Sequence, residues 1–219
     1  MNPPSPRTTS TAPAPAPTTT AAAPGAAPRR ATVERATRET RIKATLCVDG
    51  SGTIDVKTGI GFLDHMLTAL ATHAGFDLTL ACEGDLAVDD HHTAEDCALA
   101  LGDAMGRCLG DRTGIARFGE AHVPLDEALA RAVVDLVARP LAVVNLDLRR
   151  ERIGEWACEN ISHFFRSLAI AGRFTLHVDV LRGDNDHHKA EAAFKALAVA
   201  LRAAVRATGG GVRSTKGVL

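Results

Sequence analysis

Apolar and polar positions alternate in the first patterned stretch of the chain. The segments TRETRIKATLCVDG (37–50) and GTIDVKTG (52–59) both carry the two-residue period that is typical of strands. Asp49, Gly50, Ser51 and Gly52 supply turn residues between them. We therefore expect the fold to open with a β-hairpin.

A helical period follows this hairpin. In FLDHMLTALATHAG (62–75), apolar residues recur at three- and four-residue spacing and a glycine closes the segment. The apolar positions are Leu63, Met66, Leu67, Leu70 and Ala71. FDLTLACEG (76–84) predicts a strand, and HHTAEDCALALGDAMGRCLG (91–110) predicts a longer helix with Leu99, Leu101, Met105 and Leu109 on its apolar side.

The second half repeats this order. EALARAVVDLVARPLAVVNLDL (127–148) is rich in β-branched residues and broken at Arg139-Pro140, so it predicts two strands. NISHFFRSLAIAG (160–172), RFTLHVDVLRG (173–183) and DHHKAEAAFKALAVALRAAV (186–205) match the earlier helix, strand and helix. The pattern predicts an α+β fold made of two repeats, about 31–122 and 123–219. Each repeat is a two-layer α/β unit, a small sheet with helices on one face.

Composition narrows the class of protein. Residues 1–30 are almost wholly Pro, Ala, Thr and Ser, which predicts a disordered tail. The 219 residues carry a formal net charge of −1, so we expect neither nucleic acid nor a membrane surface as partner. No apolar run approaches the length of a membrane-spanning helix, and the N-terminus lacks a secretory pattern. Five cysteines without a CxxC pair suit a reducing compartment, so we expect a cytoplasmic protein.

The clearest chemical signal is the motif HHxAE, which occurs once in each repeat. Each repeat also has a histidine on the preceding helix. Positions i and i+4 of a helix share a face, so the first histidine and the glutamate of each motif can bind one ion, while the second histidine points about 100° away. The eight candidate metal ligands are His65, His91, His92, Glu95, His163, His187, His188 and Glu191.

Two sites of three imidazoles and one carboxylate each would use all eight ligands. Such a mixed shell with vacant positions suits Mn(II), Fe(II) or Zn(II) better than Ca(II), and vacancies imply substrate binding. Because neighbouring histidines diverge, a second subunit can complete each site. A lone histidine is more often structural than a ligand; repetition reverses that expectation here, whereas His122 and His177 have no counterpart and are predicted to be structural.

GIGFLDHML, DDHHTAEDCALALGDA, VPLDEALA, NDHHKAEAAFKALAVAL and the terminal STKGVL, in this order, resemble the imidazoleglycerol-phosphate dehydratase family from about Arg35 to Leu219. The resemblance implies a metal-dependent removal of water from imidazole glycerol phosphate, a step of histidine biosynthesis. It also implies two Mn(II) ions per active site, a fold like ribosomal protein S5 domain 2, and a homo-oligomer of 24 subunits with sites between subunits.

The same resemblance assigns further site residues. Glu39 looks like the family's substrate-binding and acid/base glutamate, and His65 and His73 look like substrate-site histidines, with Glu39 and His73 as the catalytic residues. Arg117, Arg139, Ser214, Thr215 and Lys216 resemble a phosphate-binding group, and guanidinium, hydroxyl and ammonium groups are the usual partners of a phosphate. Two segments depart from the family's pattern: VDLVAR lacks the usual Ser-Gly before Arg139, and SLAIAGR replaces an Asn-Ala-Gly ending.

The chemistry of such a substrate suggests a mechanism. The carbon that loses a proton has no neighbouring carbonyl, so the imidazole ring is the electron sink, and metal binding to a ring nitrogen would favour the imidazolate. That ring can expel the hydroxyl, with Glu39 moving the protons. Two other classes remain open: a metallohydrolase, although the chain has no HExxH motif, and a metal-storage protein, which would need neither Glu39 nor the phosphate-binding group.

Overall fold

The computed structural model describes residues 27–217 and 219, so most of the predicted tail at 1–30 lies outside the described part. The first sheet contains four strands in the order β1-β2-β4-β3. The elements of this half are β1 (Arg30–Ala36), β2 (Thr40–Cys47), β3 (Ile54–Lys57), α1 (Gly61–Ala74), β4 (Asp77–Gly84) and α2 (His91–Leu109). β1, β2 and β4 run antiparallel, and β3 joins β4 in parallel.

The second half has the same topology. Its sheet has the order β5-β6-β10-β7, again with three antiparallel strands and one parallel edge strand. Its elements are β5 (Phe118–Leu125), β6 (Ala128–Asp135), β7 (Leu141–Asn145), α3 (Cys158–Gly172), β10 (Thr175–Arg182) and α4 (Asp186–Val205). A two-stranded ribbon, β8 (Arg152–Ile153) with β9 (Trp156–Ala157), is inserted before α3. The predicted duplicated α+β fold is confirmed.

The predicted hairpin between residues 37–50 and 52–59 is wrong, because β2 pairs with β1 and β4 and does not pair with β3. The turn instead carries the chain past the first residue of β4, Asp77. There, Oδ1 of Asp77 accepts hydrogen bonds from the backbone N–H groups of Ser51, Gly52 and Thr53 at 2.6, 2.9 and 3.0 Å. Gly50 permits the crossing, since a Cβ at this position would lie 2.3 Å from the backbone nitrogen of Asp77.

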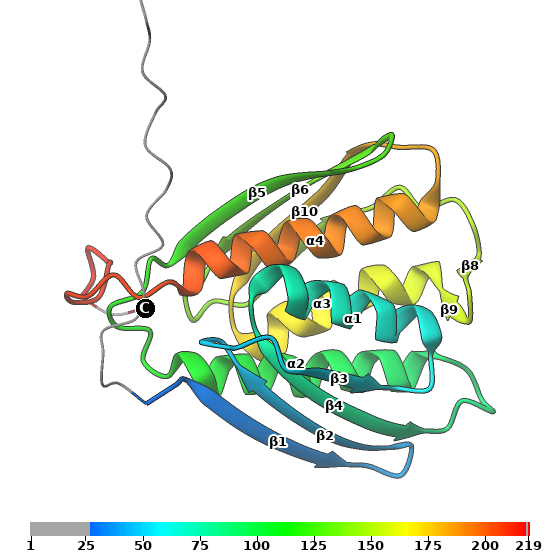
Figure 1. Cartoon of the computed structure of the whole chain (residues 1–219), viewed down its shortest axis with the longest axis horizontal. Helices are drawn as coiled ribbons and strands as arrows, with labels where there is room; N and C mark the ends of the chain where they lie inside the picture. Colours follow the sequence, from blue (N-terminus) through cyan, green and yellow to red (C-terminus); the bar gives the residue numbers. More distant parts are fainter. Residues whose placement is uncertain (1–26, 218) are drawn as a thin grey trace, which may run out of the picture.

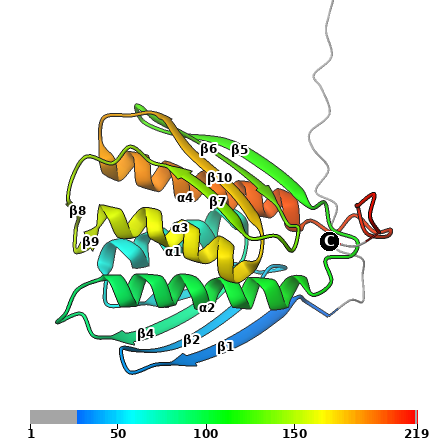
Figure 2. The same ribbon diagram turned by 180° about the vertical axis from the view of Figure 1, so that it is seen from behind.

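The four long helices lie between the two sheets (Figures 1 and 2). α1 packs against α4 and α2 against α3, so every helix contacts a helix of the other repeat. The predicted apolar face of α1 is buried, and one continuous core joins the halves. α2 and α3 approach closely at Gly102, where a Cβ would lie 2.6 Å from the carbonyl oxygen of Leu168. This packing across the repeats decides which ligand candidates meet.

Other helix and strand predictions can be compared directly. The two strands on either side of Arg139-Pro140 are present as β6 and β7. Leu99 of α2 is only half-buried, because Ala98 and Cys97 occupy the core side. The edge strands β1 and β5 were not predicted as separate elements. No helix of the described residues combines the length and apolar character needed to cross a membrane.

Candidate metal and anion sites

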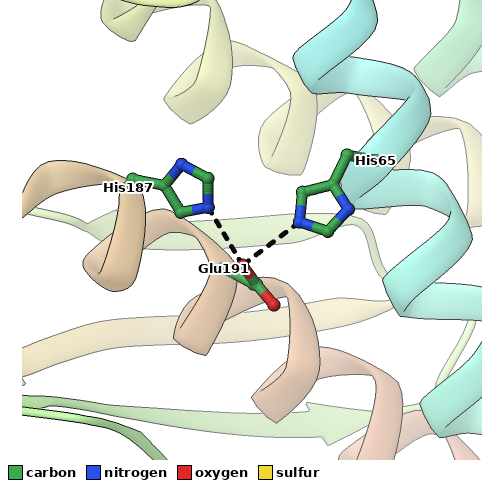
Figure 3. Close-up of side chains that lie close together, drawn as sticks. All are labelled: His65, His187 and Glu191. Carbon is green, nitrogen blue, oxygen red and sulfur yellow. Dashed lines mark hydrogen bonds and ion pairs between the residues drawn. The ribbon is translucent and has the colours of Figure 1, made fainter.

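The first cluster of metal-ligand candidates joins α1 to α4 (Figure 3). His65 of α1 and His187 of α4 each place Nε2 beside Oε2 of Glu191, at 3.2 and 3.1 Å. The three donor atoms lie within 4.8 Å of one another. Their spacing and chemistry fit a transition-metal ion held by two imidazoles and one carboxylate.

A second cluster joins α2 to α3 in the same way. Nε2 of His163 lies 2.8 Å from Oε1 of Glu95, and Nε2 of His91 lies 4.0 Å from Oε2 of the same carboxylate. The rings of His91 and His163 stack with their centroids 5.0 Å apart. Here too the three donor atoms lie within 4.8 Å. Each cluster therefore takes its histidine–glutamate pair from one repeat and its third ligand from the other.

Charge on the first cluster is set by its neighbours. Burial by itself would raise the pKa of Glu191, but hydrogen bonds from Lys195 and His65 outweigh it and lower that pKa to about 2. Nζ of Lys195 lies 2.6 Å from Oε1, so Oε2 is the oxygen that faces the histidines. The glutamate is thus an ionised ligand at neutral pH.

Two buried aspartates hold the first turns that carry these motifs. Oδ2 of Asp90 accepts hydrogen bonds from the backbone N–H of Ala157, at 2.7 Å, and from Nδ2 of Asn160, at 3.0 Å. In the second repeat, Oδ2 of Asp186 accepts from the backbone N–H groups of Arg149 and Arg150 at 2.8 and 2.6 Å. Both aspartates therefore tie a ligand-bearing helix to the connection that leads from β7 into α3.

Asn160 orients one of the ligands. Its Oδ1 lies 2.9 Å from Nδ1 of His91, and its Nδ2 is held by Asp90. An amide oxygen accepts from the protonated nitrogen, which leaves Nε2 of His91 as the metal donor. The same position in the first repeat is Phe62, whose ring centroid lies 5.0 Å from that of His187.

His92 and His188 lie outside both clusters in the described chain. Nδ1 of His92 lies 3.0 Å from Oδ2 of Asp85, and Nδ1 of His188 lies 2.8 Å from Oε2 of Glu127. These hydrogen bonds are the main cause that raises the pKa of each histidine. They also hold a proton on Nδ1 and leave Nε2 available, which is the usual outer-shell arrangement of a metal-binding histidine.

The two predicted catalytic residues have different surroundings. Glu39 lies in the turn between β1 and β2, with Oε1 3.8 Å from Nε2 of His92. Its backbone N–H donates to Oγ1 of Thr37, and its carbonyl accepts from the N–H of Asp85, which fixes the turn. His73 is exposed in the last turn of α1, and within the described residues no hydrogen bond or ion pair joins it to another predicted site residue.

The five predicted phosphate-binding residues do come together. Arg117, Arg139, Ser214, Thr215 and Lys216 line one cavity of about 700 Å³. Two further cations, Arg173 and Arg213, share this cavity and were not predicted. Sequence offered no signal for them beyond the unusual SLAIAGR ending, because a single arginine carries no periodicity.

The backbone around this cavity is unusually strained. Arg112 and Arg117 have φ angles of +62° and +74°, where side chains are disfavoured. Arg117 is held by a two-pronged ion pair with Asp135, at 2.7 and 3.0 Å, and its Nη1 donates to the carbonyl of Arg213 at 2.5 Å. This last bond ties the C-terminal segment to the wall of the cavity.

The first cluster and the cavity lie at opposite ends of α4. His187 is in the first turn of α4, whereas the backbone N–H of Arg117 donates to the carbonyl of Ala204 in the last turn. At 1.5 Å per residue, the two ends are about 25 Å apart. Figures 1 and 2 both show the C-terminal segment at the end of the helices opposite to β8 and β9.

Comparison with known proteins shows which family the chain resembles. The family model of imidazoleglycerol-phosphate dehydratase sequences matches residues 58–201, a range that contains all eight ligand candidates. The dehydratase of Pyricularia oryzae is 54% identical over 222 residues, covering 89% of this chain and 99% of that protein. That of Phytophthora nicotianae is 62% identical over 193 residues, covering 87% of this chain and 42% of that longer protein.

Solved structures agree with this comparison. Imidazoleglycerol-phosphate dehydratase from Staphylococcus aureus superposes with a TM-score of 0.75 at 36% identity, over 82% of this chain and 99% of that one. The enzyme from Pyrococcus furiosus, solved in complex with (S)-C348, superposes with a TM-score of 0.76 at 38% identity, over 85% and 100% of the two chains. Both the sequence and the fold therefore match over nearly the whole described part.

Proposed function

The chain belongs to the imidazoleglycerol-phosphate dehydratase family, and from that premise we propose that it removes water from imidazole glycerol phosphate to give imidazole acetol phosphate in histidine biosynthesis. The observation that carries the proposal is the pair of histidine–glutamate clusters, each built across the two repeats. The cationic cavity supports it, because the substrate ends in a phosphate.

We propose Mn(II) as the metal, with two ions per active site. His65, His187 and Glu191 would hold one ion, and His91, Glu95 and His163 the other. His92 and His188 of other subunits would supply the third imidazole of the two shells. The mixed imidazole and carboxylate donors suit Mn(II), Fe(II) or Zn(II), and the family resemblance favours Mn(II) among them. When bound, the ions supply Lewis acidity that favours the electron-rich form of the substrate's imidazole ring.

Glu39 is the proposed proton carrier. Its carboxylate lies beside His92, whose Nδ1 is held by Asp85, so the two groups form a short polar chain at the exposed end of β2. A carboxyl in this place can take the proton from the substrate's side-chain carbon and deliver one to the departing hydroxyl. His73 is the second predicted group of the substrate site.

The cavity at the other end of the molecule is the proposed phosphate site. The hydroxyls of Ser214 and Thr215 and the cations of Arg117, Arg139 and Lys216 provide both hydrogen bonds and charge. The first metal cluster and this cavity are about 25 Å apart along α4, which the short side chain of the substrate cannot span. We therefore propose that each active site is completed between subunits, in a homo-oligomer of 24 copies.

A cytoplasmic location completes the proposal. All five cysteines are free thiols, which fits a reducing compartment.

The direct test is turnover of imidazole glycerol phosphate by protein stripped with a chelator, before and after Mn(II) is restored. Return of activity with Mn(II) is expected. A protein that binds Mn(II) but forms no acetol phosphate would overturn the assignment in favour of a hydrolase or a storage protein.

The role of Glu39 has its own test. Glu39→Gln should lose at least about a thousandfold in turnover, the upper range for a proton-transfer group, while metal content stays unchanged. The matched control is Glu34→Gln on β1, whose partner Lys43 lies on the exposed face. Turnover by Glu39→Gln equal to that of the control would exclude the proton-transfer role.

A further inference from the structure

Arg173 occupies a backbone position that normally belongs to glycine. It follows α3 with φ +51° and ψ +56°, in the left-handed region. The equivalent residue after α1 is Gly75, with φ +72° and ψ +31°. Both helices end in the same way. The backbone N–H of Arg173 donates to the carbonyl oxygen of Ile170 at 3.2 Å, and the backbone N–H of Gly75 donates to that of Thr72 at 3.2 Å. The duplicated fold thus shows what this turn requires, and the second repeat departs from it.

Arginine at this position has two costs. The first is the strained left-handed backbone, and the second is repulsion between neighbouring positive charges. Arg173 lines the cavity that also contains Arg117, Arg139 and Lys216. Arg112 lies directly behind it, and burial, together with the charge of Arg173, lowers the pKa of Arg112. A cation placed at a strained position among other cations implies a compensating gain, and strained residues of this kind gather at binding sites.

The surrounding structure holds Arg173 in place. Nη1 of Arg112 donates to the carbonyl oxygens of Arg173 and Leu136 at 2.6 and 3.1 Å, and Nη2 donates to that of Gly172 at 2.9 Å. These bonds fix the last turn of α3 against the strand that leads to Arg139. The backbone from which the Arg173 side chain enters the cavity is therefore rigid.

The charge of Arg173 is also uncommitted. Asp135 partly neutralises Arg117 through its two-pronged pair. Over residues 27–217 and 219, neither Arg173 nor Arg139 makes an ion pair with a carboxylate. Two guanidinium groups in one cavity thus face solvent with their charge unpaired, which is the arrangement that binds a phosphate dianion.

We propose that Arg173 is an additional phosphate-binding residue of this cavity and raises the affinity of the chain for its phosphorylated substrate. The inference rests on the function proposed above. The proposed ligand is a phosphate monoester, and it is bound by the side chain of Arg173. The equivalent residue of the first repeat, Gly75, has no side chain.

Arg173→Gly tests the proposal, because the stability of the fold and the affinity for phosphate should then change in opposite directions. Glycine relieves the left-handed turn, so the melting temperature should stay equal or rise. The KM of the Mn(II)-loaded enzyme for its substrate, and the inhibition constant of inorganic phosphate, should both rise about tenfold, as expected for loss of one charge-assisted hydrogen bond. Arg166→Ala, at an exposed position of the same helix outside the cavity, is the control and should leave both constants unchanged.

Lys216→Ala distinguishes a wrong role for Arg173 from a wrong location of the phosphate site. If Lys216→Ala weakens phosphate binding and Arg173→Gly does not, the cavity is the phosphate site and the role given to Arg173 is wrong. If neither substitution changes phosphate binding, the cavity itself is not the phosphate site and that part of the proposed function fails. A stabilised Arg173→Gly with weaker phosphate binding, and with kcat unchanged at saturating substrate, supports the proposal.

Discussion

Replacing Asn160 with leucine should weaken one metal cluster and spare the other. Asn160 is buried, and its amide links Nδ1 of His91 to the carboxylate of Asp90 at 2.9 and 3.0 Å. Leucine has a similar volume but can neither accept from the imidazole nor donate to the aspartate. His91 would then lose the group that holds its ring and its proton, so Nε2 would no longer be preset as a donor.

The magnitude follows from the kind of contact removed. Loss of a hydrogen-bond partner behind a metal-binding histidine typically lowers metal affinity about 10- to 100-fold, or about 1.4–2.7 kcal/mol. The other cluster provides an internal standard. Phe62 stands at the equivalent position beside His187, so that histidine does not depend on such an amide.

Competition between chelator-stripped protein and a fluorescent Mn(II) indicator measures both affinities. The wild-type chain should bind two ions, and in Asn160→Leu one of the two affinities should fall while the other is unchanged. Asn145→Leu is the matched control, because Asn145 lies on β7, away from both clusters, and its side chain donates to Asp179 on the outer face of the sheet. Thermal melts show whether each variant is folded. Equal weakening of both ions, or no weakening, would refute the reasoning.

Three further outcomes are expected. Backbone hydrogen bonds, that of Thr53 first, lower the pKa of Asp77; its stabilisation is therefore present above the unfolded-state pKa near 4 and lost as pH falls through the folded value. Asp77→Asn should cost about 2 kcal/mol in urea unfolding at pH 7, and a loss that does not shrink as the pH is lowered below the unfolded-state pKa would contradict this. Gly119→Ala places a Cβ 2.0 Å from the carbonyl oxygen of Ala200 and should destabilise by about 3 kcal/mol in thermal melts, unlike Gly211→Ala, which meets nothing within 4 Å. Removing metal with a chelator should lower the melting temperature, since each cluster bridges two helices; identical melts would mean that no metal binds there.

The local pattern alone determined much of this protein. The duplicated HHxAE motifs pointed to four of the six residues that form the two clusters, because i and i+4 positions share a helix face whatever the helix packs against. The histidine that recurs on the preceding helix of each repeat supplied the other two, His65 and His163. Apolar periodicity likewise located the buried face of α1. The phosphate-binding residues were predicted through family resemblance, and the structure brings those five into one cavity.

Only the tertiary structure decided which elements meet. Sequence periodicity reports the face of a helix but not its partner, so the pairing of His65 with His187 and of His163 with His91 required the packing of α1 on α4 and of α2 on α3. For the same reason the strand pattern at 52–59 could not reveal that β3 joins β4 and not β2. Arg173 became a candidate only when folding brought the end of α3 beside the C-terminal segment. Contacts between residues far apart in sequence arise from packing the whole core, which no local pattern encodes.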